Sequence, residues 1–347
     1  MNLTIALGDL HLGHPTTLLQ EAAGRAALAH AIDVETYGEP YKMVLLGDVI
    51  DLCYVQPMDG LRLLEQMIRE LVDSTQLQEV TWIIGNHDFH YFATILEDTN
   101  FEKFSDRIYQ FDPDGFDFIV PVEIAYPEHF VWHNGEGNCT LFSHGHLLGP
   151  DGSLFSTILD EPRSSVESVC SLNYAWLEFA WWNIWQDKRV GDALWRGTSV
   201  LAAFMVESFR GNSVARMARY VNDWLVNTRK ATTAVQNYVF GHTHQAGEKR
   251  IRIGHSIPVE KHGPLAGITV HTHPIRMVNT GAWIVERRIK RKSEYYEPPD
   301  SMIVRLAGSK LTMKRVKFKK EYVKLIGDRG DIVHPAEWGL WFQRENV

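Results

Sequence analysis

Five short polar clusters of this chain each follow an apolar, strand-like segment. They read GDLH, GDVID, GNHD, SHGH and GHTH, and each combines a glycine with aspartate, asparagine or histidine. The glycine lets the backbone turn sharply, so that the neighbouring polar side chains can converge. Carboxylates, imidazoles and an amide oxygen, without a thiolate, suit borderline divalent ions such as manganese, iron or zinc. The clusters therefore indicate a metal centre.

Each cluster has a simpler interpretation when it is taken alone. An aspartate after a strand commonly caps a helix, and a single histidine in a loop is commonly a solvated surface residue. Five such clusters after five apolar segments are much harder to explain in that way. Their candidate ligands are Asp9, His11, Asp48, Asn86, His144, His242 and His244.

This set of ligands is too large for one tetrahedral zinc ion, but it suits two ions that share a ligand. A carboxylate that bridges two ions about 3.5–4 Å apart makes a clamp for phosphoryl oxygens. A water or hydroxide between the ions would be acidified and aimed in line with the leaving oxygen. The expected cofactors are two divalent ions, with manganese first and iron or zinc as alternatives. The expected partner is a phosphorylated substrate.

The clusters need strands that end at one edge of a sheet, and the first half of the chain supplies them. Short apolar runs that end at a glycine predict buried strands at 3–8, 43–47 and 80–85. Apolar residues at helical spacing predict helices within 16–36 and 59–73. This alternation favours a parallel sheet covered by helices, in which ligands sit just past the strand ends.

The second half of the chain contains a helical block between further strands. Strands are predicted at 117–126, 130–133 and 139–144, in a second sheet, and strand patterns return after residue 235. Residues 150–232 are rich in helix formers and in tryptophan, which predicts a helical insertion into one α/β domain. The insertion is interpreted as a subdomain with its own core, a lid over an apolar part of a substrate, or a surface for a membrane or partner.

The bulk composition excludes several classes of protein. Hydrophobic content of 45% and charged content of 22% are typical of a soluble globular protein. The net charge of −8 argues against a general nucleic-acid coat, although residues 284–324 are basic and form either a solvated face or a phosphate-attracting rim. Three cysteines without CxxC spacing fit a reducing compartment. The N-terminus reads as a strand rather than a signal peptide, and no apolar run reaches the roughly 18 residues of a membrane span. The expected location is the cytoplasm.

Taken in order, the clusters resemble the motifs of the calcineurin-like metallophosphoesterases. D-x-H, G-D-x-x-D, G-N-H-D, H-G and G-H-x-H are all present, without a substitution at the metal positions. The resemblance implies an α/β fold, a four-layer α/β/β/α sandwich with the site at one edge of two sheets. The expected division of the chain is a metallophosphoesterase domain at 1–149 and 233–320, a helical insertion acting as cap or lid at 150–232, and a C-terminal tail at 321–347.

The resemblance also implies a role for each site residue. One ion would be held by Asp9, His11 and His244, the other by Asn86, His144 and His242, with Asp48 bridging the two. His87 would meet the phosphate or the leaving oxygen as general acid or charge stabiliser. Asp88 would orient the His87 imidazole, and Asp51 would support the ligands rather than bind metal.

The roles of the histidines outside these positions are left open. His14, His90 and His146 lie beside motifs and are expected either as solvated loop residues or at the mouth of the site. The segment between GHTH and VNTGAW is longer than in compact family members. It is expected to be a loop that carries histidines rather than a second metal site; these are His255, His262, His271 and His273.

The implied activity is hydrolysis of a phosphate ester or anhydride by a hydroxide held between two divalent metals. GDVIDL and the helical insertion also resemble the UDP-diacylglucosamine pyrophosphohydrolases, which generally have arginine where this chain has His87. The DLHLG start and the basic segment resemble DNA repair nucleases, so nucleic acid is an alternative substrate but not the favoured one. A non-catalytic scaffold of the same fold is the last alternative, and the complete ligand set argues against it.

Overall fold

The structure is a computed structural model of the chain. It describes residues 3–332 except 53, 86, 89–90, 92–106, 127, 134–136, 146–233, 243, 257–268, 291–292 and 298. The expected helical insertion at 150–232 therefore lies outside the described residues. None of the helices in the described part is long and apolar enough to cross a membrane.

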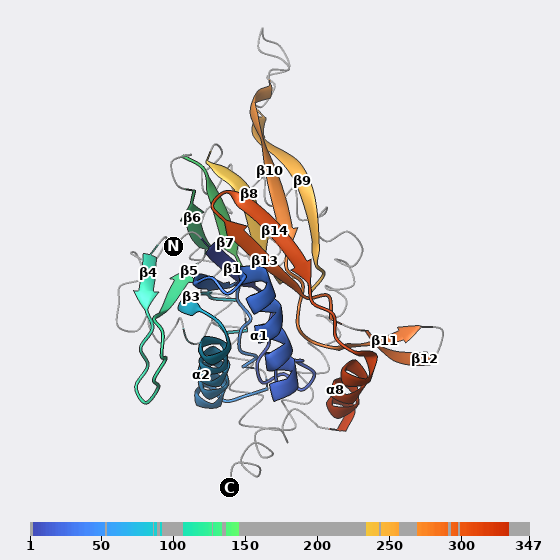
Figure 1. The fold of residues 1–347 in the computed structure, drawn as a ribbon. Coiled ribbons are helices and arrows are strands. Elements are labelled where there is room, and N and C mark those ends of the chain that lie inside the picture. The colour runs from blue at the N-terminus through green and yellow to red at the C-terminus, as the bar shows by residue number, and fades with distance from the viewer. Residues whose placement is uncertain are drawn as a thin grey trace, which may run out of the picture.

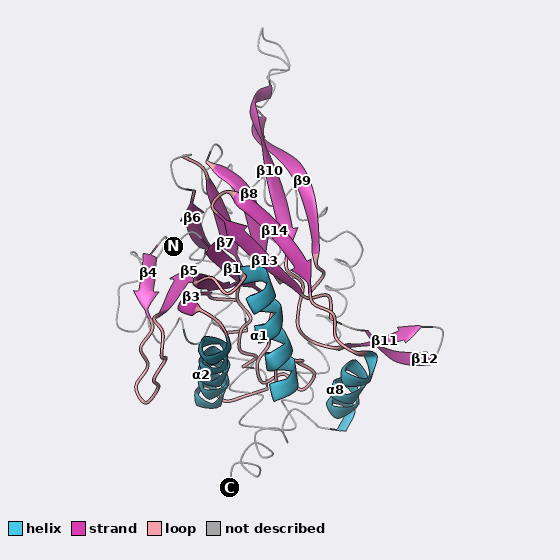
Figure 2. Ribbon diagram, viewed as in Figure 1, coloured by secondary structure: helices cyan, strands magenta, loops and turns pink. Residues whose placement is uncertain are grey.

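The described part contains two large mixed sheets, a two-stranded sheet and three helices, arranged as in Figures 1 and 2. The first sheet has the order β14-β13-β1-β2-β3-β5-β4, with bounds β1 Leu3–Leu7, β2 Tyr41–Leu45, β3 Leu77–Ile83, β4 Arg107–Gln110, β5 Val122–Tyr126, β13 Met302–Ala307 and β14 Lys310–Arg315. The second has the order β6-β7-β8-β10-β9, with bounds β6 Glu128–Trp132, β7 Cys139–Ser143, β8 Val235–Phe240, β9 Gly247–Ser256 and β10 Thr269–Asn279. A separate pair consists of β11 Glu286–Lys290 and β12 Ser293–Glu297.

The first sheet is buried on both faces at its central strands, which explains why β1 and β2 are mainly apolar. Ile5 and Leu7 of β1 face the cluster that contains the helices, whereas Ala6 faces the second sheet. The cluster between the sheets joins residues such as Ala6 and Val44 to Phe142 and Val239 of the second sheet. The site is therefore carried by a sheet that is packed from both sides.

Two helices cover the outer face of the first sheet, side by side (Figure 1). These are α1 Ala22–Thr36 and α2 Pro57–Ser74. Leu61, Leu64, Ile68 and Leu71 of α2 are buried at helical spacing, and Pro57 suits the first turn, where no hydrogen-bond donor is needed. The third helix, α8 Lys320–Ile332, packs its buried side chains near Leu18 and Val285, and it begins at the expected end of the domain.

The structure corrects three details of the expected elements. Residues 117–126 do not contribute to the second sheet, because β5 pairs in parallel with β3 in the first. The helix expected within 16–36 begins only at Ala22, because Thr17 forms a bridge with Ile284. The expected loop with histidines is mainly a hairpin of β9 and β10, in which Nε2 of His273 lies 3.1 Å from the carbonyl oxygen of Val235.

The parallel strands bring the polar clusters to one edge. Strands β1, β2 and β3 run in the same direction, so the loops that follow them lie next to each other. Strands β7 and β8 of the second sheet are also parallel, and their following loops are joined by a hydrogen bond from Gly241 N to His144 O of 2.9 Å. Five strand ends therefore converge where the two sheets meet.

Candidate metal centre

The loops after β1 and β2 hold each other in place. Backbone N–H groups of Asp9 and His11 donate to the carbonyl oxygens of Gly47 and Asp48, at 3.2 and 2.8 Å. Asp51 N in turn donates to the Leu12 carbonyl at 2.9 Å. The hydrogen-bonded pairing of the two strands thus continues beyond their ends. It places Asp9, His11, Asp48 and Asp51 beside each other on a fixed backbone.

Five of the predicted ligands have a left-handed backbone. The described residues include only six non-glycine residues with positive φ, and Tyr37, at the end of α1, is the sixth. The five ligands and their φ angles are Asp9 (52°), His11 (49°), Asp48 (48°), His242 (68°) and His244 (55°). This conformation is uncommon for residues with a side chain, and where it clusters it marks functional sites. The backbone alone therefore points to the same residues as the motifs.

Two glycines of the motifs leave space for ligand side chains. A Cβ atom on Gly47 would lie 2.6 Å from Cγ of the His144 ring, and Gly47 itself has φ of +83°. A Cβ atom on Gly241 would lie 2.2 Å from a carboxylate oxygen of Asp9. Each glycine lies beside a ligand from another strand, which explains its presence in the motif.

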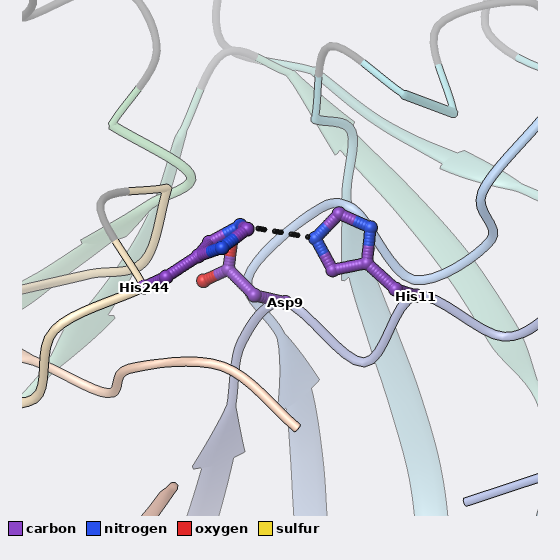
Figure 3. A group of neighbouring side chains, drawn as sticks. All are labelled: Asp9, His11 and His244. Atoms are coloured by element: carbon purple, nitrogen blue, oxygen red, sulfur yellow. Dashed lines mark hydrogen bonds and ion pairs between the residues drawn. The ribbon is translucent and has the colours of Figure 1, made fainter. Parts of the chain in front are cut away.

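Asp9, His11 and His244 form the first group of candidate ligands (Figure 3). Nε2 of His11 lies 3.2 Å from Nε2 of His244, which lies 3.8 Å from a carboxylate oxygen of Asp9. Nδ1 of His11 lies 3.0 Å from Oδ2 of Asp51, so Nδ1 carries the proton and Nε2 presents its lone pair. Asp9 is buried, and its carboxylate also accepts from the backbone N–H of His242.

Asp48, His144 and His242 form the second group. Nε2 of His144 lies 3.2 Å from Oδ2 of Asp48, and its Nδ1 donates to the Leu46 carbonyl at 2.8 Å. Burial opposes the charged imidazole, but the Asp48 carboxylate raises the pKa of His144 to about 9. Burial likewise opposes the Asp48 carboxylate, but His144 and His87 hold its pKa well below the usual range. Without a metal, Nε2 of His144 therefore carries a proton that it donates to Asp48, at the position that a metal ion would take between them.

One pair of donor atoms in each group has the spacing of ligands on a shared ion. Two atoms about 2.0–2.1 Å from one ion, at tetrahedral to octahedral angles, lie roughly 3.0–3.4 Å apart. The facing pairs His11–His244 and Asp48–His144 are both 3.2 Å apart. Ligand histidines typically donate their other ring N–H to an oxygen, as His11 and His144 do. These residues fit divalent cations. Asn86, the remaining predicted ligand, lies outside the described residues, as do His90 and His146.

Asp51 is the carboxylate that holds the His87 imidazole. Its Oδ1 lies 2.9 Å from Nδ1 of His87, and its Oδ2 lies 3.0 Å from Nδ1 of His11. Burial opposes the charge on Asp51, but His87 and His11 hold its pKa well below the usual range. One carboxylate therefore joins a candidate metal ligand to the candidate acid. The side chain of His87 is 30% exposed, so a substrate can reach it.

The expectation that Asp88 orients His87 is wrong. Asp88 is fully buried, and its carboxylate accepts from Trp82 Nε1 at 2.6 Å and from the backbone N–H groups of Asp48, Val49 and Gly85. Burial, and then the charge of Asp48, raises the pKa of Asp88 to about 7. Asp88 thus fixes the backbone that carries Asp48, and it contacts His87 only as the next residue in the chain.

His14 is placed at the same site, although the sequence left it open. The half-buried ring lies edge-on to Tyr54, with 4.5 Å between ring centroids, and 6.1 Å from the ring of His11. Burial lowers its pKa to about 3, so the ring is neutral. The spacing Asp9-x-His11-x-x-His14 was the only sequence signal for this position.

Comparison with known proteins identifies the family. A family model described as calcineurin-like phosphoesterase matches residues 4–246, which is more than half of the chain. The chain therefore belongs to the calcineurin-like phosphoesterase family. No curated protein matched the sequence. A crystal structure of a dimetal phosphatase from Danio rerio is similar at 12% identity and a TM-score of 0.36, covering 91% of this chain and 99% of that chain. A similarity this low supports no conclusion about this chain.

Membership of this family defines the class of the protein. It is a metal-dependent phosphoesterase, a hydrolase that acts on phosphoester bonds, and the family implies two divalent ions as cofactors. The expected fold class is confirmed, with two mixed sheets and helices in an α/β sandwich. The helical insertion, which lies outside the described residues, is not part of that confirmation.

Proposed function

We propose that this protein hydrolyses a phosphate ester or anhydride at a centre of two divalent ions. The first ion is assigned to Asp9, His11 and His244, the second to Asn86, His144 and His242, and Asp48 is assigned to both. The observation that supports this assignment most is the pair of 3.2 Å contacts between donor atoms, His11 with His244 and Asp48 with His144. Three of these four residues, all except His144, have a left-handed backbone. Manganese is the proposed metal, with iron or zinc as alternatives, because the ligands are nitrogen and oxygen without sulfur.

The charges of the ligands suit an anionic substrate. When bound, the two ions acidify a water nucleophile and neutralise charge on the phosphoryl oxygens. Only two of the seven ligands, Asp9 and Asp48, are carboxylates. Two divalent ions with two carboxylates leave a net charge of about +2, which attracts a phosphate group. Asn86 contributes an oxygen without a charge.

His87 is proposed to donate a proton to the leaving oxygen. The Asp51 carboxylate accepts a hydrogen bond from Nδ1 of His87, so Nε2 is the ring atom that can contact the substrate. The Asp51 carboxylate also stabilises the protonated ring, which is the form that acts as an acid. Asp51 orients both this ring and His11, so the acid keeps a fixed position relative to the first ligand group. Because this residue is histidine and not arginine, a general phosphoesterase is favoured over a UDP-diacylglucosamine pyrophosphohydrolase.

The first test concerns the metal. Purified protein is loaded with manganese, iron or zinc, and its metal content is measured by elemental analysis. We expect about two ions per chain, and the metal-loaded protein is then screened against monoesters, diesters and pyrophosphates. A protein that neither contains nor recruits a divalent ion would contradict the proposed activity and favour the scaffold interpretation.

The second test concerns His87. With manganese and a phosphate ester that releases an alkyl alcohol, His87→Ala is expected to lower kcat by about 10²- to 10⁴-fold, the usual contribution of a positioned acid. With bis-p-nitrophenyl phosphate the loss should be smaller, because p-nitrophenolate leaves without a proton. His30→Ala is the matched control, because His30 is exposed on α1, away from the site. Unchanged activity of His87→Ala would show that the role given to this residue is wrong.

A further inference from the structure

His14 has one defined position beside the proposed metal centre. It follows Gly13, which has φ of +91°, in a turn closed by hydrogen bonds from His14 N to His11 O and from Thr17 N to His14 O. Its ring is held against Tyr54, which follows Asp51 by three residues in the next loop. The spacing from His11 alone would suit one more metal ligand, so the ring nitrogens decide what His14 does.

The hydrogen bonds of His14 fix where its proton is. The backbone N–H of Thr16 points at Nδ1 with an N–N distance of 3.1 Å, and the Thr16 hydroxyl is also 3.1 Å from Nδ1. A backbone N–H can only donate, so Nδ1 accepts and carries no proton. The proton of the neutral ring is therefore on Nε2. Among the described residues, Nε2 of His14 has no hydrogen-bond partner.

This arrangement is the reverse of that in the proposed ligands. His11 and His144 direct their Nδ1 atoms at an oxygen, of Asp51 and of Leu46, which leaves a lone pair on Nε2 for a metal. In His14, Nδ1 accepts the N–H of Thr16, and Nε2 carries the proton. A metal cannot bind Nε2 unless Thr16 gives up its hydrogen bond. His14 is therefore a donor at the site and not a ligand.

We propose that His14 binds the substrate by donating its Nε2 proton to an oxygen of the phosphoryl group. The His14 ring centroid lies 6.1 Å from that of His11, a proposed ligand, and 4.5 Å from that of Tyr54. The imidazole of His14 offers a hydrogen bond without adding positive charge to a centre that already holds cations. The inference rests on the proposed function, because it requires a phosphate group at the metal centre.

Two substitutions of His14 test the Nε2 hydrogen-bond donor separately from the rest of the imidazole ring. His14→Asn can keep an acceptor near Thr16 but removes the donor at the Nε2 position. His14→Gln has an amide N–H at about the position of Nε2. With manganese-loaded protein, binding of inorganic phosphate is measured by calorimetry, and manganese binding is measured separately. We expect His14→Asn to bind phosphate about 10- to 100-fold more weakly, as for a lost hydrogen bond to a charged group. His14→Gln is expected to retain most of the affinity.

Manganese stoichiometry and affinity are expected to be unchanged in both variants, and His30→Asn on the exposed face of α1 is the control. Equal phosphate affinity of wild type and His14→Asn would overturn the inference. Loss of a manganese ion in either variant would also overturn it, because His14 would then be a ligand. Phosphate binding that depends on His14, in a protein that hydrolyses neither phosphate esters nor anhydrides, would support this inference and contradict the proposed function.

Discussion

The contribution of the Trp82–Asp88 hydrogen bond to stability can be measured by comparison with a second buried tryptophan, Trp283. Both Trp82 and Trp283 are fully buried, but only Trp82 has a hydrogen-bond partner for Nε1, the Asp88 carboxylate at 2.6 Å. Nε1 of Trp283 is buried without a partner among the described residues. Trp82→Phe and Trp283→Phe remove the same atoms, so their loss of packing is similar. The difference between the variants isolates the polar contact.

At a pH above the Asp88 pKa of about 7, where this carboxylate is ionised, we expect Trp82→Phe to be less stable than Trp283→Phe by about 1.5–3 kcal/mol, the usual contribution of a hydrogen bond to a charged group. Asp88 keeps three backbone N–H donors in the variant, from Asp48, Val49 and Gly85, so a larger loss is not expected. Trp283→Phe loses no hydrogen bond and removes an unpaired N–H, which offsets part of its packing loss.

The assay is urea unfolding of the metal-free protein, followed by far-UV circular dichroism because both variants change the tryptophan fluorescence. The midpoint of unfolding should fall further in Trp82→Phe, with an unchanged slope. Manganese affinity should fall in this variant by about 10- to 100-fold, as for other partners behind a ligand, because Asp88 holds the backbone of Asp48. Equal stability of the two variants would refute the reasoning.

Three further predictions concern other contacts of the site and the core. Asp51→Asn should lower manganese affinity by about 10- to 100-fold and lower kcat, measured by calorimetry and steady-state kinetics, because an amide cannot serve both His11 and His87 as the carboxylate does. Gly47→Ala should lower the thermal midpoint and weaken metal binding, because its Cβ would lie 2.6 Å from the His144 ring. Burial lowers the pKa of His129 from 6.5 to about 4, so the unfolded chain binds a proton first and stability falls as the pH drops from about 6.5 to 4. His129→Gln should show a smaller fall in urea-unfolding free energy over that range.

Each of these predictions has a control in the same chain. Asp59→Asn changes an exposed carboxylate on α2 and should leave manganese binding unaltered. Gly38→Ala introduces the same left-handed strain at φ of +70° but meets no atom within 4 Å, so Gly47→Ala must cost clearly more. His30→Gln changes an exposed histidine and should keep the full pH dependence. A variant that behaves like its control would show that the contact named for it is unimportant.

Six of the seven candidate ligands lie together in two groups, because each one follows directly after an apolar strand. That they bind metal stays a prediction. The sequence failed for the partner of His87, where Asp88 is the neighbour in the chain and Asp51 is the neighbour in space. Asp51 comes 36 residues earlier and reaches His87 only because β2 and β3 are parallel and adjacent. No pattern within one loop carries that information.

Two other differences have related causes. The apolar alternation of β5 shows that its faces are buried, but it does not identify the neighbouring strand, and so the sheet was misassigned. The role inferred for His14 depends on the direction of a hydrogen bond from Thr16, which is set by backbone orientation. The sequence left His14 between a solvated loop residue and one at the mouth of the site, because residue type and spacing do not give the position of the ring proton.

The left-handed backbone at five ligand positions also affects how this protein would respond to selection. Such a conformation costs about 1–2 kcal/mol for a residue with a side chain and almost nothing for glycine. Selection of a random library for folding alone, without metal, should therefore enrich glycine at positions such as His242 and His244. The enriched variants would be more stable proteins without the metal centre. A stability screen on this chain therefore needs a metal-binding step, because otherwise it would select against the proposed metal-binding histidines.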